Sequence, residues 1–220
     1  MSRNSAIEPA FESMRIAVIG AGWMGGAVGK AWVRAGHEVM FASRHPEKLE
    51  KSFRHLGGRA RVGSVREAVE FAQVVLLTVP YAALAAIGDA LNPLFSSRLI
   101  LDAANPSSDP TSRFAKDAFA AGVGITTQHL LGGATVVRAF SCVDATEVDA
   151  SSQRSGDRLC VPIAGDDARA VSCAERLVRD AGCEPLFVGT LASAKQFERG
   201  TQAFRANATL PRLKAILNLL

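Results

Sequence analysis

The sequence has few cysteines and histidines and lacks the long apolar run of a membrane span. It holds four cysteines and four histidines in 220 residues, and no two cysteines are spaced as C-x-x-C. We therefore expect the cysteines to be reduced thiols in a cytoplasmic protein, with no metal site. No apolar run approaches the ~20 residues that a bilayer-spanning helix requires.

Charge of one sign is also scarce. The chain carries 25 basic and 21 acidic residues, a formal net charge of +4, and the two signs are interleaved rather than gathered in runs. This pattern is typical of a solvated surface, so we expect neither nucleic acid nor a membrane as a partner. The small positive excess is compatible with a weak attraction for acidic small molecules.

Strand-like apolar runs alternate with helical segments along most of the chain. Strands are predicted at 15–19, 37–42, 74–79, 99–101 and 134–140, and helices up to residue 35 and at 64–71, 81–91 and 110–121. This alternation predicts an α/β fold of the Rossmann type, with a doubly wound parallel sheet.

Composition divides the chain into three predicted parts. Residues 1–13 mix charges and proline, lack the apolar core of a signal peptide, and are expected to be a tail. Small polar residues at 146–157 predict a boundary, so that 14–150 form the main domain and 151–220 a small C-terminal α/β part. In that part we expect strands at 159–164 and 185–188, and helix over 191–220 with Pro211 near a helix start.

A glycine motif, G-x-G-x-x-G, stands between the first strand and the first helix. Gly20 allows the tight turn, Gly22 lets the backbone approach a pyrophosphate, and Gly25 lets the helix lie close to the strand. Trp23 and Met24 complete the loop, whose amides begin the helix and face the phosphates. In this strand–turn–helix context the motif predicts a dinucleotide site.

The end of the second strand indicates which dinucleotide binds. A site for NAD places a carboxylate there for the ribose 2′-hydroxyl, whereas this chain has Ser43 and Arg44, with Lys48 four residues after the arginine. A hydroxyl, a guanidinium and an ammonium suit a 2′-phosphate. The predicted cofactor is therefore NADP.

Ligands in such folds lie beyond the carboxyl ends of the strands. Val79 and Pro80 are candidates for an apolar wall over the cofactor, Tyr81 for a cofactor contact, and Asn105 for orienting the nicotinamide ribose or carboxamide. No acid–base constellation accompanies them, and Lys195 is the one candidate acid. Hydride transfer between two redox cofactors depends on positioning more than on such groups.

At these residues the sequence resembles a known family, the NADP oxidoreductases dependent on coenzyme F-420, an 8-hydroxy-5-deazaflavin. Their relatives include the cytosolic reductase domains of membrane ferric reductases. The resemblance covers residues 14–205 and rests on 14–20, Ser43-Arg44 with Lys48, 77–80, 137–140, 161–167, 189–191 and Glu198.

The resemblance implies NADPH in a cleft, with a deazaflavin or flavin-like acceptor stacked on the nicotinamide. It adds Ala145 and Leu191 to Val79, Tyr81 and Asn105 as residues near the ribose and nicotinamide. We also expect a homodimer. The chain departs from the family at 105–110 and 140–144, which face the acceptor, so the sequence leaves the acceptor's identity open.

Two alternatives use the same cofactor motif. Imine and hydroxy-acid dehydrogenases of the pyrroline-5-carboxylate reductase and β-hydroxyacid dehydrogenase types share a similar glycine loop, but they add a long helical domain. Only about 70 residues follow Ser151, so we expect such a site only if a partner subunit completes it. The other alternative is a non-catalytic dinucleotide sensor.

Overall fold

The computed structural model describes residues 12–109 and 112–219. Its strands are β1 Arg15–Ile19, β2 Glu38–Ala42, β3 Ala60–Gly63, β4 Val74–Leu77, β5 Leu99–Asp102, β6 Thr135–Arg138, β7 Cys160–Gly165 and β8 Glu184–Gly189. The α-helices are α1 Trp23–Arg34, α2 Glu50–Phe53, α3 Val65–Phe71, α4 Leu84–Phe95, α5 Arg113–Ala121, α6 Val123–Leu130, α7 Ala145–Ser151, α8 Ala168–Asp180 and α9 Leu210–Ile216, with 3-10 turns η1 Pro46–Lys48, η2 Arg54–Leu56, η3 Tyr81–Ala83 and η4 Leu191–Phe197.

The strands form one sheet in the order β3-β2-β1-β4-β5-β6-β7-β8. Strands β1 to β6 are parallel, which confirms the predicted doubly wound sheet, and β7 pairs with β6 in the antiparallel sense. The chain leaves β1 outward through β2 and β3 and returns to the other side of β1 at β4. Ligands bind at such a reversal of strand order, outside the carboxyl ends of the strands.

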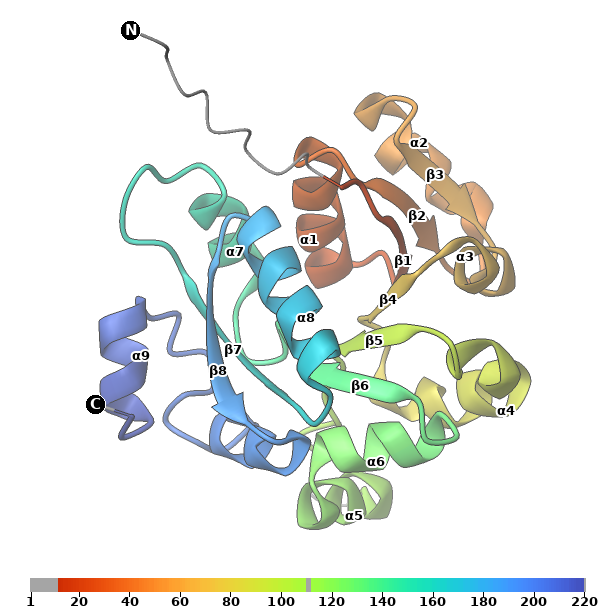
Figure 1. Ribbon diagram of the computed structural model, residues 1–220. Coiled ribbons are helices and arrows are strands. Elements are labelled where there is room, and N and C mark those ends of the chain that lie inside the picture. The colour runs from red at the N-terminus through yellow and green to blue at the C-terminus, as the bar shows by residue number, and fades with distance from the viewer. Residues whose placement is uncertain (1–11, 110–111, 220) are drawn as a thin grey trace, which may run out of the picture.

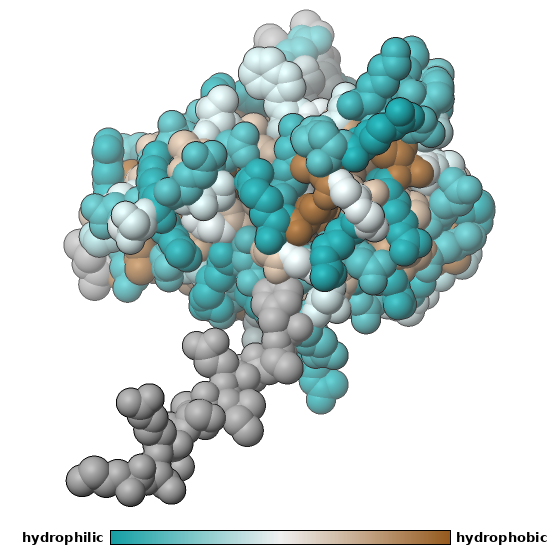
Figure 2. All heavy atoms as spheres, turned by 90° about the horizontal axis from the view of Figure 1, so that it is seen from above, coloured by the Kyte–Doolittle hydropathy of each residue, from teal (hydrophilic) through white to brown (hydrophobic). Residues whose placement is uncertain are grey.

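Two apolar cores lie on the two faces of the sheet. Alternate side chains of β1 enter different cores, with Ile16 and Val18 on one face and Ala17 and Ile19 on the other. The first core is completed by α1, α7 and α8 and the second by α3, α4 and α6. Figure 1 shows α1 and α8 on the same side of the sheet. On the face seen in Figure 2, hydrophilic residues predominate and hydrophobic ones show only in small areas between them.

Local sequence signals account for several of the element boundaries. Helix α3 begins with a capping box in which the Ser64 hydroxyl accepts from the Glu67 amide and the Glu67 carboxylate accepts from the Ser64 amide. Gly36 ends the α1 turn with a φ of +97°, a conformation that glycine adopts without strain. Pro211 lies in the first turn of α9, as predicted.

The structure differs from the sequence-based expectations in three places. Residues 146–157, which are small and polar and were predicted as a boundary, include most of helix α7, in which Val148 and Ser151 are buried. Residues 198–209, predicted as helix, connect η4 to α9 without regular structure, and the backbone of Arg205 and Asn207 there is left-handed. Strand β3 was not predicted at all.

Two further predictions concern the helix after Pro110 and the division of the chain into two parts. The helix predicted from Pro110 begins at Arg113, and Pro110 itself lies outside the described residues, as do 1–11 of the predicted tail. The division between 14–150 and 151–220 stays a prediction, although β7 and β8 continue the same sheet across it.

Candidate functional site

The glycine loop has the geometry that a close approach of backbone to ligand requires. Gly20 has a φ of +97°, and a Cβ there would lie 2.8 Å from the Thr78 carbonyl and the Val79 nitrogen. A Cβ on Gly25 would collide with the Gly20 carbonyl oxygen. A Cβ on Gly22, in contrast, would meet no atom of the described residues within 4 Å. The space beside Gly22 is therefore open to a ligand.

The first turn of α1 has unpaired amides at this loop. Its first internal hydrogen bond runs from the Gly26 amide to the Gly22 carbonyl, 2.8 Å. No described side chain caps the helix, and the first turn contains no acidic residue. The amides and the positive end of the helix dipole are thus available to an anion. Trp23 is 87% exposed beside them, and Met24 is half-buried.

The end of β2 presents uncompensated positive charge. Arg44 and Lys48 are both exposed, and neither forms an ion pair within the described parts of the chain. The Ser43 hydroxyl accepts a hydrogen bond from the His45 amide, 3.0 Å, which fixes the turn from which Arg44 projects. This surface fits the dianionic 2′-phosphate of NADP.

A recess of about 200 Å³ opens where β4 and β5 end. Its described lining residues are Pro80, Tyr81, Ala82, Asn105, Pro106, Ser107, Ser112, Phe114 and Ala115. Thus the structure brings together three sequence candidates, Pro80, Tyr81 and Asn105. Val79 lies next to them, half-buried, and its backbone nitrogen faces Gly20.

Tyr81 turns its phenol away from the solvent. The hydroxyl donates to the Val123 carbonyl at 3.1 Å, and the side chain is almost fully buried. Burial raises the pKa of Tyr81 to about 12. Its ring lies 5.5 Å from the Phe114 ring, tilted by 41°. Tyr81 therefore supplies an aromatic wall and holds its proton firmly.

Behind the recess lies a buried polar cluster that sequence reasoning missed. Arg138, the last residue of β6, is fully buried and forms an ion pair with Asp102, the last residue of β5, at 2.8 Å. The same guanidinium reaches the Asn105 Oδ1 atom at 3.1 Å. Asp102 directly follows the predicted strand 99–101, and Arg138 lies within the predicted strand 134–140. These two opposite charges next to and inside apolar runs were the available signal.

The remaining candidates lie in different surroundings. Ala145, the first residue of α7, lines a surface groove together with Gly22 and Trp23. Leu191 is buried and faces Gly124 of α6. The Lys195 ammonium donates to the Ala120 carbonyl at 2.9 Å, so this lysine secures η4 to the end of α5.

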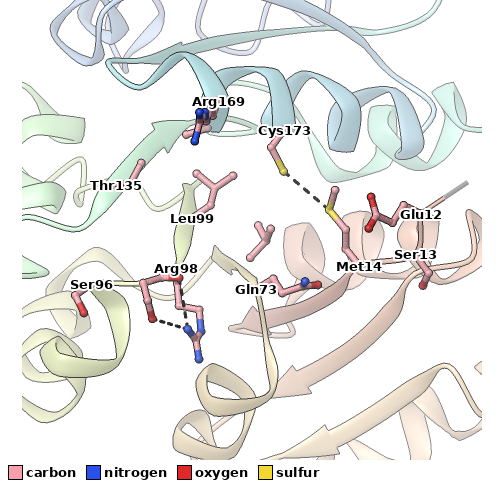
Figure 3. Close-up of a pocket in the computed structure, with 13 residues that line it drawn as sticks. Glu12, Ser13, Met14, Gln73, Ser96, Arg98, Leu99, Thr135, Arg169 and Cys173 are labelled. Carbon is pink, nitrogen blue, oxygen red and sulfur yellow. Dashed lines mark hydrogen bonds between the residues drawn. The ribbon is translucent and has the colours of Figure 1, made fainter. Parts of the chain in front are cut away.

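The opposite end of the strands holds a cleft of about 380 Å³ (Figure 3). It lies among the starts of β4, β5 and β6 and the residues around Met14, beneath α8. The Cys173 thiol contacts the Met14 sulfur at 3.9 Å, and burial raises the pKa of this thiol. The described residues that line this cleft include none of the glycine loop. Within residues 12–109 and 112–219, no cluster of three potential ligands could hold a metal, and no helix could cross a membrane.

The chain resembles known proteins in sequence and in structure. The chain is 28% identical over 200 residues to the metalloreductase STEAP3 of Rattus norvegicus, which covers 90% of this chain and 38% of that protein. A hypothetical protein from Sinorhizobium meliloti has a structure similar to this one, with a TM-score of 0.73, 25% identity, and coverage of 90% and 94% of the two chains.

A second solved structure is described as an F-420-dependent NADP reductase from Arthrobacter sp. FB24. It has a TM-score of 0.67, 23% identity, and coverage of 83% of this chain and 88% of that one, which shows the common fold. Residues 15–106 match the family model described as "NADP oxidoreductase coenzyme F420-dependent". The match covers 92 of the 220 residues and agrees with the resemblance seen in the sequence, and the fold of the chain is Rossmann-like.

Proposed function

We propose that the protein transfers hydride between NADP and a planar acceptor of the deazaflavin (coenzyme F-420) or flavin type. The observation that carries this proposal is the chemistry of the recess at the ends of β4 and β5. Its described lining residues include no histidine, lysine, aspartate or glutamate, and its single phenol is buried and donates to a backbone carbonyl.

The cofactor half of the proposal rests on the glycine loop and the end of β2. The open space at Gly22 and the free amides of α1 suit the pyrophosphate, and Ser43, Arg44 and Lys48 suit the 2′-phosphate. Trp23, Met24, Gly20 and Gly25 shape this loop. When bound, the nicotinamide ring supplies or receives the hydride.

The acceptor half rests on the walls of the recess. Reduction of an imine or a ketone requires a proton at nitrogen or oxygen, which enzymes usually deliver from a placed side chain. The recess offers aromatic and small surfaces instead, with Tyr81 and Phe114 side by side. Such walls favour a flat conjugated ring, which packs by stacking, over a small substrate that needs an acid.

The test is NADPH oxidation by the purified protein with a panel of acceptors. We expect turnover with the deazaflavin or with free flavins. A ferric chelate belongs in the panel because the curated relative is a metalloreductase, although the chain spans 38% of that protein. Binding of NADPH with no oxidation by either ring system would contradict the proposal. Turnover of a cyclic imine or a 3-hydroxy acid alone would favour the dehydrogenase alternative, and binding without any turnover would favour a sensor.

Three further properties belong to the same proposal. Ala145 and Leu191 are proposed cofactor neighbours. Lys195 is a weak candidate for a catalytic acid, because its ammonium already donates to a backbone carbonyl. All four cysteines are unpaired, which supports a cytoplasmic location. A homodimer is proposed, and light scattering of the purified protein measures it.

A further inference from the structure

We propose that Arg138 is a positioning residue, whose buried guanidinium holds Asn105 in place at the nicotinamide end of the cofactor site. The inference rests on the proposed function, because it concerns the same recess. It adds a residue that does not touch the recess and acts through one that does.

The sheet itself brings the two charges together. Asp102 and Arg138 are partners in the parallel register of β5 and β6, and both side chains are fully buried. One Asp102 oxygen accepts from Arg138 Nη1 at 2.8 Å, and the other accepts from the Ala104 amide at 2.9 Å. The carboxylate thus binds both the guanidinium and the segment that leaves β5.

Asn105 is held at both ends of its amide. Its Oδ1 atom accepts from Arg138 Nη2 at 3.1 Å, and its Nδ2 atom donates to the Ser141 carbonyl at 2.6 Å. The first contact fixes which end of the amide is oxygen, since a guanidinium only donates. One N–H of Nδ2 and one lone pair of Oδ1 remain for a ligand, and Asn105 lines the recess.

The planar fork of arginine is what this arrangement needs. Nη1 reaches both Asp102 and the Ala104 carbonyl, 2.6 Å away, while Nη2 reaches Asn105. A lysine ammonium at the same place supplies one point of charge. It can still compensate Asp102, but it cannot reproduce the fork that spans three acceptors.

Stability alone does not account for this pair. Replacing a buried ion pair with packed apolar residues is often neutral or stabilising, and the neighbours Val136, Val137 and Leu101 show that apolar residues suit these strands. The guanidinium stands instead where two strands end at the recess, and two of its three acceptors lie in the segment 104–105 beyond β5.

The experiment measures Kd by calorimetry for two ligands, NADPH and 2′,5′-ADP. The second ligand has the 2′-phosphate but no nicotinamide. In Arg138→Lys we expect Kd for NADPH to rise about tenfold, the equivalent of one charged hydrogen bond, and Kd for 2′,5′-ADP to change less than about twofold. A residue with a merely structural role would weaken both ligands together.

Asn105→Ala completes a double-mutant cycle. If Arg138 acts through Asn105, the lysine substitution has little further effect on NADPH binding in the Asn105→Ala background. Arg179→Lys, at an exposed ion pair with Glu175, is the matched control. If Arg138→Lys does not fold, Asp102→Asn with Arg138→Gln takes its place, because it removes both buried charges together.

An unchanged Kd for NADPH, equal weakening of both ligands, or additive effects in the cycle would each overturn the inference while leaving the proposed function intact. Failure of the unaltered protein to bind NADPH would overturn both. The two failures are therefore distinguishable.

Discussion

The Trp32 indole donates a hydrogen bond to the Leu177 carbonyl at 2.7 Å, which joins α1 to α8 across 145 residues of sequence. Trp32 is fully buried and also meets the Phe140 ring edge-on, with centroids 6.1 Å apart. The helix that carries the glycine loop is thus anchored to the part of the chain that follows β7.

Trp32→Phe should lower the free energy of unfolding by about 2 kcal/mol, through the lost hydrogen bond and the smaller ring. Urea denaturation without cofactor measures this change. Trp23→Phe is the matched control, since Trp23 is 87% exposed, and it should shift the free energy by less than about 0.5 kcal/mol. Equal effects of the two variants would contradict the anchoring role.

Stability should fall as the pH falls below about 6.5 because of His37. Its Nδ1 atom accepts from the Met14 amide, its Nε2 atom lies 3.1 Å from Asp180, and the ring is fully buried. Burial lowers the pKa of His37, and this outweighs the raising effect of Asp180, while Arg176 lowers it further. The unfolded chain therefore binds more protons, so the contribution is complete above the unfolded value of 6.5 and is lost on acidification.

The measurement is urea denaturation of the unaltered protein and of His37→Asn between pH 7.5 and pH 5. The variant is less stable at neutral pH, and its stability should depend less on pH across this window. An identical slope in both proteins would show that other groups cause the dependence.

Local patterns are the basis of the prediction for the part of the candidate site that is contiguous in sequence. Strand β1, the glycine loop and the end of β2 lie within residues 15–48, and glycine spacing and strand-end residues are short-range signals. The fold around them followed from strand–helix alternation.

The rest depends on pairings between distant segments. Asp102 meets Arg138 only because β5 and β6 are neighbours in register, and the direction of Tyr81 depends on α6, which supplies the carbonyl of Val123. The antiparallel direction of β7 could not be predicted from local sequence either, because apolar periodicity does not encode strand direction.

Gly22 and Gly26 form a matched pair for testing the pyrophosphate site. In the part of the chain that the structure describes, a Cβ at either position would meet no atom within 4 Å, so alanine should be accommodated at both. Gly22→Ala should raise Kd for NADPH about tenfold or more, because the methyl group occupies the space left for the ligand. Gly26→Ala, inside α1, should leave Kd within about twofold. Calorimetry distinguishes the two, and equal Kd values would place the pyrophosphate elsewhere.

Arg44→Ala should reduce selectivity for NADPH over NADH. The exposed Arg44 guanidinium has no ion-pair partner among the residues that the structure describes. Loss of a charge-assisted contact to a 2′-phosphate costs about 1.5–3 kcal/mol, or about tenfold to a hundredfold in Kd. Binding of NADH should change less than about threefold. Arg54→Ala, at an exposed pair with Glu50, is the control. Similar losses for both cofactors would refute the 2′-phosphate assignment.

Tyr81→Phe should destabilise the protein without slowing hydride transfer. The phenol donates to the Val123 carbonyl in the interior, so its removal should cost about 1 kcal/mol of unfolding free energy. With a pKa of about 12, the phenol is protonated across the accessible pH range. The rate of NADPH oxidation and its pH profile should therefore stay within about twofold of the unaltered protein. A tenfold slower rate would make Tyr81 a direct participant, and the ring would then have to turn its hydroxyl into the recess.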